Sequence, residues 1–366
     1  MTLLWEEIRH KRLLWLLVFV PAVLAAEHLF HADGKLLFGL SVLAIVPLAA
    51  LLSHATESVA SRTGDSIGGL LNATLGNLTE LVIALTALIA GQHMLVKASI
   101  AGAIVTNSLF MLGASLLLGG LRHHTQEFNA STARLQAGQL FLATIALLVP
   151  SMVVGDKGGE PQFLHTLSLS LAVLLVVIYV LGMLFSLKTH KQFFGSASPA
   201  AVGGDDHGTP WPVGLAVGVL AGVTVLVALV SHIFVGSVEV AAQALGMSDA
   251  FVGFIVVALV GAAAEMASAF SAARKNRLDM SVGIALGSST QIALFVAPVL
   301  VLASYFLGPE PMTLLFWPGA VAMMFLASLT VAMLCNSGRS AWFLGVLAIA
   351  VYLTFAITLY VVPPKV

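Results

Sequence analysis

Charge is scarce in this sequence: only 9% of the 366 residues are Asp, Glu, Lys or Arg, whereas soluble globular proteins carry about 25%. Hydrophobic residues make up 59% of the chain, and its mean hydropathy is +1.02. These values exclude an ordinary soluble domain. Sixteen basic and seventeen acidic residues nearly cancel, which excludes the strongly basic surface of a nucleic-acid-binding protein.

Cysteine is almost absent as well. The single residue, Cys335, excludes an intramolecular disulfide and a metal site built from several thiolates. No signal peptide is expected, because the first apolar stretch lacks a small-residue cleavage site and leads directly into further apolar stretches. The loops are short and hold no nucleophile or metal-binding cluster, so we do not expect an enzyme.

What the sequence does contain is a series of apolar stretches, each near the roughly 20 residues that a transmembrane helix needs. We identify eleven of them: 13–29, 36–54, 68–91, 97–120, 137–154, 164–187, 213–235, 249–272, 279–307, 313–334 and 341–362. They predict an all-α, polytopic membrane protein with eleven transmembrane helices.

The distribution of Lys and Arg predicts the orientation, because cytoplasmic loops carry an excess of both. With the N-terminus inside, only Lys35, Lys97, Lys157 and Lys365 lie outside, and the other twelve of the sixteen basic residues lie inside. This bias supports a cytoplasmic N-terminus and an external C-terminus.

One long cytoplasmic segment, 188–212, is rich in Gly, Pro and Ala and divides the chain near its middle. We therefore expect four parts: residues 1–35 with an extra N-terminal helix, a first repeat at 36–187, the linker, and a second repeat at 213–366.

Two motifs recur in the two halves of the chain. The segment GNLTE, from Gly76 to Glu80, parallels GAAAE, from Gly261 to Glu265. In the next stretch of each half, three positions also align: Ser99, Ala103 and Asn107 with Gly283, Gly287 and Gln291. Because the paired stretches enter the membrane from opposite sides, we expect two inverted five-helix repeats plus the extra helix. Inverted repeats are typical of secondary transporters, whose site lies near mid-membrane.

Two acids lie well inside apolar stretches, Glu80 and Glu265, where an acid costs roughly 2.5–3.5 kcal/mol to insert. No Lys or Arg lies deep enough to pair with them, so their partners are protons or a mobile cation; a protonated Glu hydrogen-bonded within the bundle is the structural alternative. Gly76 and Gly261 suggest broken helices with free carbonyls, and Asn77 shares a face with Glu80. Such oxygen ligands suit Ca²⁺, Mg²⁺ or Mn²⁺.

A second and shallower pair of acids precedes the first. Glu57 ends the second stretch, and Glu239 follows the seventh. Each either guides cations or carries protons at a vestibule, or is an ordinary acid at the membrane interface; the pattern does not separate these possibilities.

Several segments resemble the cation/proton exchangers of the calcium/cation antiporter superfamily. GGLLNATLGNLTELVIAL at 68–85 resembles the first repeat motif of that family, and KNRLDMSVGIALGSSTQIALFVAPVLVL at 275–302 resembles the second. HATE at 54–57 and LFSLKTH at 184–190 also fit. The resemblance covers roughly residues 40–360.

The resemblance implies a Ca²⁺/H⁺ antiporter in the plasma (inner) membrane of a prokaryote, with Glu80 and Glu265 binding the cation and protons in alternation. It implies no resident cofactor, since Ca²⁺ is the transported substrate. This sequence departs from the family's second motif, Gly-Asn-Ala-Ala-Glu-His: Ala262 replaces the Asn and Met266 replaces the His. One amide oxygen is therefore missing from half of the expected site, which bears on cation selectivity.

The expected mechanism is competition for one pair of carboxylates. Two such groups held close in a low-dielectric site cannot both stay charged and unpaired, so either protons or a divalent cation must neutralise them. Asn107, Ser288 and Gln291 would hydrogen-bond the carboxylates or line the path. The alternatives are a Na⁺-coupled exchanger of the same fold and a cation channel.

Overall fold

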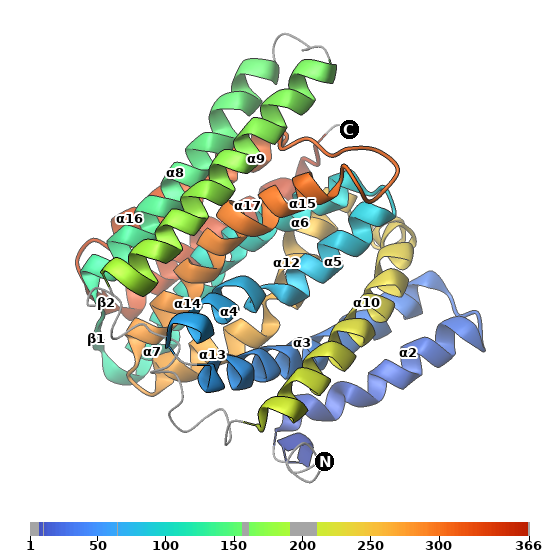
Figure 1. The fold of residues 1–366 in the computed structure, drawn as a ribbon, viewed down its shortest axis with the longest axis horizontal. Coiled ribbons are helices and arrows are strands. Elements are labelled where there is room, and N and C mark those ends of the chain that lie inside the picture. The colour runs from blue at the N-terminus through green and yellow to red at the C-terminus, as the bar shows by residue number, and fades with distance from the viewer. Residues whose placement is uncertain (1–6, 10, 64, 156–160, 191–210, 365–366) are drawn as a thin grey trace.

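The structure, a computed structural model, describes residues 7–9, 11–63, 65–155, 161–190 and 211–364, and most of them are helical (Figure 1). The first half contains η1 (Arg12–Val18), α2 (Phe19–His28), α3 (Gly34–Arg62), α4 (Asp65–Leu75), α5 (Leu78–Ile89), α6 (His93–Val105), η2 (Thr106–Met111), α7 (Leu112–His123), β1 (Thr125–Glu127), α8 (Ala130–Gly155), α9 (Pro161–Leu184) and η3 (Phe185–Thr189). The second half contains α10 (Val213–Ala244), α11 (Asp249–Phe251), η6 (Val252–Val257), α12 (Ala258–Gly261), α13 (Ala263–Arg274), α14 (Leu278–Gln291), η7 (Ile292–Val296), α15 (Ala297–Ala303), α16 (Pro318–Leu334), β2 (Arg339–Ala341) and α17 (Trp342–Val361).

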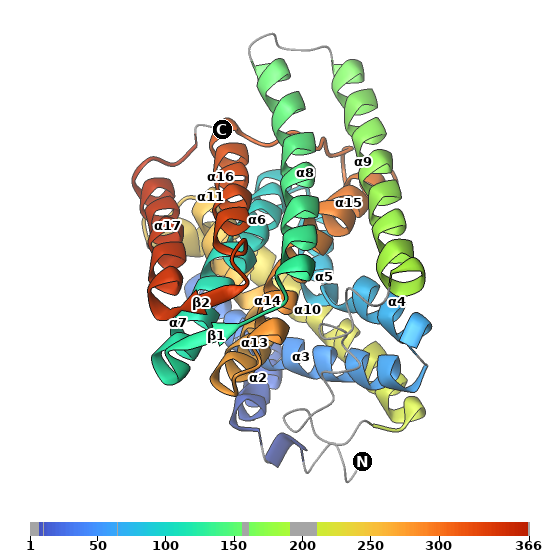
Figure 2. The same cartoon turned by 90° about the vertical axis from the view of Figure 1, so that its left-hand side faces the viewer.

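The helical fold expected from the sequence is confirmed, with one addition. Strands β1 and β2 pair in antiparallel register, from Thr125 opposite Ala341 to Glu127 opposite Arg339. This short sheet is not among the elements expected from the sequence. It ties the connection between α7 and α8 to the connection between α16 and α17 (Figure 2).

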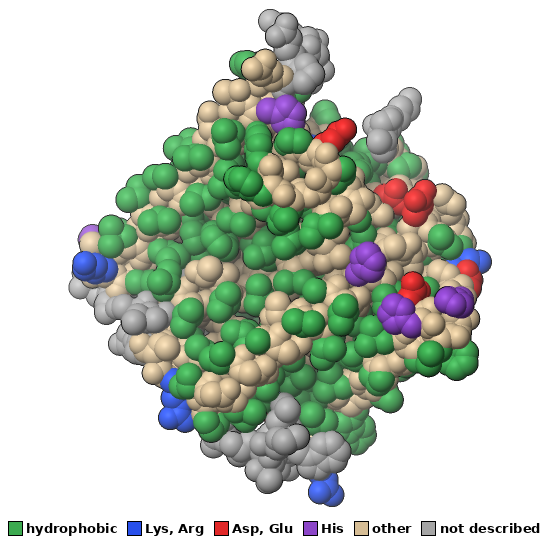
Figure 3. Space-filling view, turned by 45° about the vertical axis from the view of Figure 1, so that its right-hand side comes forward, with side chains coloured by type: hydrophobic (Ala, Val, Ile, Leu, Met, Phe, Trp, Pro, Cys, Tyr) green, Lys and Arg blue, Asp and Glu red, His purple; other side chains and the backbone are tan. Residues whose placement is uncertain are grey.

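The outer surface is apolar, as a lipid-facing surface must be. In the most apolar 18-residue stretch of the helical segment Gln162–Thr189, which contains most of α9, only 22% is buried, and α10 has the same value. Exposed side chains on α9 include Val173, Val177 and Leu181. Figure 3 shows one face of the molecule covered largely by hydrophobic side chains, with few charged ones among them. Helices suit this environment because they satisfy their own backbone hydrogen bonds.

The number of spans is a separate question from the helical fold. Among the described residues, seven helices are long and apolar enough to cross a membrane, or eight if the bent pair Asp249–Gly261 and Ala263–Arg274 is one span. Helical segments nevertheless occupy each of the eleven predicted stretches. The first and third stretches are each divided between two shorter helices, and α16, in the tenth stretch, has 17 residues. These three are therefore too short to be counted among the spanning helices. The count of eleven therefore stays a prediction.

Two long helical segments form the centre of the molecule. In the segment His93–His123, made of α6, η2 and α7, 89% of the most apolar 18-residue stretch is buried. In Leu278–Ala303, made of α14, η7 and α15, the value is 72%. Around this centre, α3 packs along α10, α7 along α17, and α8 along α16. Two buried polar residues of the predicted site, Asn107 and Ser288, lie on these two central segments.

The loop between α15 and α16, residues 304–317, closes one end of the molecule. Its backbone amides at Leu314 and Phe316 donate hydrogen bonds to the hydroxyls of Ser168 (3.0 Å) and Ser151 (3.4 Å). Lys97 donates to the Thr313 hydroxyl at 3.1 Å. This end lies opposite η1 (Figure 2). The loop therefore fastens α6, α8 and α9 together on the side predicted to be external.

Most of the predicted linker at 188–212 falls outside the described residues, which omit 191–210. The division of the chain into two repeats joined by this linker stays a prediction.

Candidate functional site

Two broken helices meet at the centre of the molecule. In the first, α4 ends at Leu75 and α5 begins at Leu78, so Gly76 and Asn77 form the break. In the second, α12 ends at Gly261 and α13 begins at Ala263, with a bend of 58° between the two parts. Glu80 and Glu265 lie in the first turns of α5 and α13. Each carboxylate is thus near a helix N-terminus, where negative charge is favoured.

Glycine at both breaks has a steric reason. A Cβ atom on Gly76 would lie 2.7 Å from the carbonyl oxygen of Asn72. A Cβ atom on Gly261 would lie 3.0 Å from Cγ of Glu80 and 3.5 Å from its Oε1. Gly261 therefore packs directly against the side chain of Glu80, and this contact brings the two halves of the chain together at the acids.

Both glutamates are half-buried and lack full hydrogen bonding. Within the described part of the chain, Oε1 of Glu80 and Oε2 of Glu265 are buried without a hydrogen-bond partner. The carboxylates of Glu80 and Glu57 both lie close enough to Glu265 to interact with it electrostatically. Buried polar oxygens are rarely left unpaired, and each exception calls for an explanation such as an ion or a proton.

An amide and hydroxyl network lies beside the two acids. Asn77 Nδ2 donates to Gln291 Oε1 at 2.5 Å, and the Ser288 hydroxyl donates to Asn77 Oδ1 at 2.6 Å. Asn107 Nδ2 in turn donates to Ser288 Oγ at 2.8 Å. Ser288 also interacts with Glu265. The structure therefore brings the four predicted supporting side chains into one connected network next to the acids.

The network is not symmetric between the two halves. Asn77 on the first broken helix engages Gln291, but its counterpart on the second broken helix is Ala262, which is fully buried and has no hydrogen-bonding side chain. Asn107 is the counterpart of Gln291, and in the described residues its buried Oδ1 has no partner. The missing amide at position 262 thus coincides with an unpaired amide oxygen at Asn107.

The two shallower acids, Glu57 and Glu239, differ in how they lie relative to the site. Glu57 on α3 lies near enough to Glu265 to affect it, so it belongs to the surroundings of the site. Glu239 on α10 is exposed, and its Oε1 accepts a 3.5 Å hydrogen bond from Gln243 on the same helix. The structure therefore does not bring Glu239 to the other predicted site residues.

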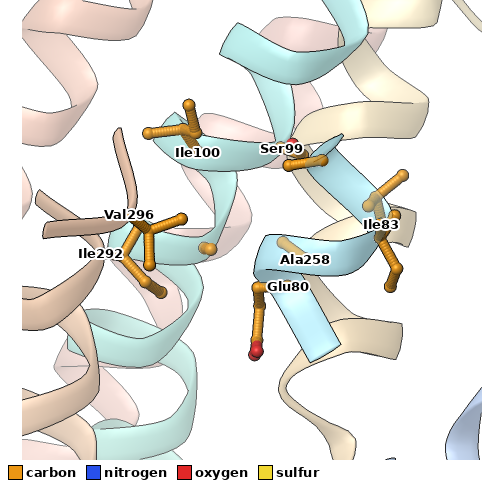
Figure 4. Close-up of a pocket in the computed structure, with 10 residues that line it drawn as sticks. Glu80, Ile83, Ser99, Ile100, Ala258, Ile292 and Val296 are labelled. Carbon is orange, nitrogen blue, oxygen red and sulfur yellow. The ribbon is translucent and has the colours of Figure 1, made fainter. Parts of the chain in front are cut away.

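A small cavity of about 20 Å³ adjoins Glu80. Its lining comprises Glu80, Ile83, Ala84, Ser99, Ile100, Ala103, Val257, Ala258, Ile292 and Val296. In Figure 4 the Glu80 carboxylate points away from Ile83 and Ser99. The cavity has room for about one water molecule and is walled mainly by aliphatic side chains, so it offers no passage for a hydrated cation on that side of Glu80.

A polar residue near the network was missed from the sequence. Gln136 on α8 has a buried Oε1 with no partner among the described residues, and its Nε2 would lie 3.6 Å from a Cβ atom on Gly287. The signal in the sequence is an amide directly before the predicted stretch 137–154. The actual helix, α8, begins earlier at Ala130.

A bound cation would need more than carboxylates. No group of three or more His, Cys, Asp or Glu side chains in the described chain is arranged to hold a metal ion. Amide, hydroxyl and backbone carbonyl oxygens would have to complete the shell around Glu80 and Glu265, which is the ligand chemistry of Ca²⁺.

Comparison with known proteins identifies the family. The sodium/calcium exchanger protein family matches residues 34–188 and 215–361. The chain belongs to this family. It is 40% identical to the Ca²⁺/H⁺ antiporter of Aphanothece halophytica, over 95% of this chain and 96% of that protein. It is 39% identical to the Ca²⁺/H⁺ antiporter ChaA of Bacillus subtilis, over 90% and 93%.

The fold is shared with a solved member. The structure of native YfkE superimposes with a TM-score of 0.80 at 34% sequence identity, covering 96% of this chain and all of that one. Together with its apolar surface, this match makes the protein an integral membrane protein of the exchanger fold.

Proposed function

We propose that this protein is a secondary antiporter that exchanges Ca²⁺ for H⁺ and that Glu80 and Glu265 form its shared site. The proposal rests on one observation above all: two acids from opposite halves lie together in the interior, each with a buried oxygen that lacks a hydrogen bond. The relatives named Ca²⁺/H⁺ antiporter match nearly the whole chain, which supports the same assignment. We assign no enzyme activity and no resident cofactor.

The exchange follows from neutralisation of the site. An unloaded pair of carboxylates in a low-dielectric interior is costly, so either protons or a divalent cation must accompany the conformational change. Asn77, Asn107 and Ser288 place amide and hydroxyl oxygens beside the acids. Among the described residues the buried Oδ1 of Asn107 has no hydrogen-bond partner, so it is available to contribute to a cation shell.

The proposed architecture is eleven spans in two inverted five-helix repeats, residues 36–187 and 213–366, after an extra N-terminal helix. Matching breaks in α4–α5 and α12–α13 support the repeat, as do π-helical segments at matching places, η2 and η7. Alternating access would arise from rocking of one helix group against the rest.

The proposed orientation has the N-terminus in the cytoplasm and the C-terminus outside, in a prokaryotic plasma (inner) membrane. It is supported by the opposite positions of η1 and the end of α17 in Figure 2 and by the bias of Lys and Arg toward one side.

The test is transport in liposomes with an imposed pH gradient. Ca²⁺ uptake and lumenal pH are followed together, with and without Na⁺. We expect Ca²⁺ uptake to dissipate the pH gradient without Na⁺. Glu80→Gln and Glu265→Gln should each abolish exchange and leave thermal unfolding near that of the wild type, because the amide keeps the shape and removes the charge. Glu127→Gln, an exposed acid paired with Arg339, is the matched control and should transport normally.

Contrary results separate the alternatives. Normal transport by both Glu variants would contradict the site. Ca²⁺ movement only with Na⁺ would instead assign a Na⁺-coupled exchanger, a candidate that the family's name favours. Ca²⁺ flux that leaves the pH gradient intact without Na⁺ would indicate a channel. Movement of another divalent cation in place of Ca²⁺ would indicate a changed cation selectivity, for which the departures from the family motif at Ala262 and Met266 are the first candidates.

A further inference from the structure

A second cavity lies on α13, away from the carboxylates. It has a volume of about 440 Å³ and is lined by Arg122, Ala267, Phe270, Ser271, Arg274 and Lys275. This volume is within the range of small-molecule sites. Ala267 is two residues after Glu265, so it projects from roughly the opposite side of the helix. The cavity therefore does not belong to the proposed transport site.

The charge of the cavity is of one sign. Arg122, Arg274 and Lys275 contribute three exposed cations, and no acid is among the lining residues. The guanidinium groups of Arg122 and Arg274 have no hydrogen-bond or ion-pair partner in the described part of the chain. Like charges gathered around one concave site repel one another, and a bound anion removes this cost.

The basic end of the cavity is held in place by the backbone. His123 Nε2 lies 2.9 Å from the carbonyl oxygen of Arg274, and Gln126 Nε2 donates to the carbonyl of Ala273 at 2.9 Å. These contacts join the end of α13 to the end of α7 and to β1. Arg122 on α7 and Arg274 on α13 are therefore held at fixed positions relative to each other. This arrangement distinguishes the cavity from a general excess of positive charge at a membrane surface.

The order of residues along α13 indicates what kind of anion fits. Ala267 and Phe270 lie nearer the middle of the molecule, Ser271 follows, and Arg274 and Lys275 lie at the helix end. This sequence from apolar to hydroxyl to cationic matches the order of acyl chain, glycerol and phosphate in a phospholipid. Basic pockets between helices on the cytoplasmic side are known to hold anionic headgroups, and charge bias predicts this end to be cytoplasmic.

We infer that this cavity binds the phosphate-bearing headgroup of an anionic phospholipid from the cytoplasmic leaflet. Arg122 and Arg274 contact the phosphate, Ser271 donates to the headgroup, and the acyl chains lie along Ala267 and Phe270. The lipid contacts the same helix that carries Glu265, on its other side.

The test measures lipid binding and does not depend on transport. Purified full-length protein is reconstituted in phosphatidylcholine vesicles with a photoactivatable phosphatidylglycerol, and crosslinks are mapped by mass spectrometry. We expect crosslinks on α7 and α13. Arg122→Gln and Arg274→Gln should each reduce them about fivefold, from roughly 1 kcal/mol per basic residue near the membrane surface. Arg274→Lys, which keeps the charge, should retain most of the crosslinking and guards against a folding defect.

Lys188→Gln is the matched control, because it removes an exposed cation from η3 outside the cavity. Unchanged crosslinking in both arginine variants would overturn the inference. An equal loss in Lys188→Gln would also overturn it, because binding would then reflect general surface charge. Displacement of the lipid probe by inorganic phosphate would overturn the lipid assignment and identify a site for soluble oxyanions.

Discussion

Gly261 packs directly against the side chain of Glu80. It is the last residue of α12, and its Cα faces the stem of Glu80 so closely that a Cβ atom would lie 3.0 Å from Cγ. A helix would ordinarily gain about 0.5–1 kcal/mol of stability from alanine in place of glycine. The close approach explains why the smaller residue is needed here despite that cost.

We therefore predict that Gly261→Ala impairs transport without unfolding the protein. The added methyl group must displace the Glu80 side chain by a few tenths of an ångström. Because a displacement of about 1 Å at a reacting group can cost about 100-fold, we expect a loss of about tenfold in kcat/KM for Ca²⁺. The measurement is initial Ca²⁺ uptake in liposomes, together with the midpoint of thermal unfolding.

Gly236→Ala on α10 is the control for this variant, because a Cβ atom there meets no other atom within 4 Å. It should keep full transport and gain slightly in stability. Equal Ca²⁺ uptake by Gly261→Ala and Gly236→Ala would show that the contact between Gly261 and Glu80 has no effect on transport.

The two broken helices differ in the residue that directly precedes their second parts. Asn77, before α5, has an amide that contacts both Gln291 and Ser288, whereas Ala262, before α13, has only a methyl group. On the predicted repeat, Ala262 leaves the second half without the amide that Asn77 supplies in the first. In the same alignment Asn107 is the counterpart of Gln291, and in the described residues its buried Oδ1 lacks the donor that Gln291 receives from Asn77.

Restoring the amide tests this asymmetry. We expect Ala262→Asn to raise the apparent affinity for Ca²⁺ about fivefold, since one added hydrogen bond or ligand oxygen contributes about 1 kcal/mol. The measurement is the KM for Ca²⁺ uptake. Ala262→Leu adds volume without an oxygen and should not raise the affinity. The same KM in both variants would rule out an amide role at this position.

At the scale of the whole molecule, the direction of transport depends on which side supplies protons. If protons and Ca²⁺ compete for Glu80 and Glu265 as proposed, acidifying the side where Ca²⁺ binds should raise the apparent KM for Ca²⁺. Acidifying the side where Ca²⁺ leaves should speed its release. Each pH unit across the membrane corresponds to about 1.4 kcal/mol per proton.

An equilibrium measurement then gives the stoichiometry. If two protons exchange for one Ca²⁺, a gradient of about one pH unit should sustain a Ca²⁺ gradient of about 100-fold at zero membrane potential. The exchange would be electroneutral, so a clamped potential should leave this ratio unchanged. With three protons the ratio would respond to voltage, at about 2.3 kcal/mol per charge per 100 mV. No Ca²⁺ gradient at any imposed pH difference would contradict proton coupling.

Much of this organisation follows from local patterns. Apolar stretches of membrane length determine helices in any polytopic protein, because the lipid interior offers the backbone no other partner. Acids inside such stretches stand out for the same reason, and so Glu80 and Glu265 could be selected without a structure. Glycine before each acid likewise marked the two helix breaks. The sheet of β1 and β2 could not be predicted, since three-residue strands carry almost no pattern of their own.

What the sequence by itself determined was the class of protein, its helical fold and the choice of the two acids at the candidate site. Only the tertiary structure decided which polar side chains meet. Glu57 lies near enough to Glu265 to interact with it electrostatically while Glu239 is exposed, although both occupy similar places in the chain. Gln136, Gly261 and the cavity at Arg122 and Arg274 likewise acquire their surroundings from other helices. The reason is physical: hydropathy is a property of each segment alone, whereas the direction a side chain faces depends on how helices far apart in sequence pack together.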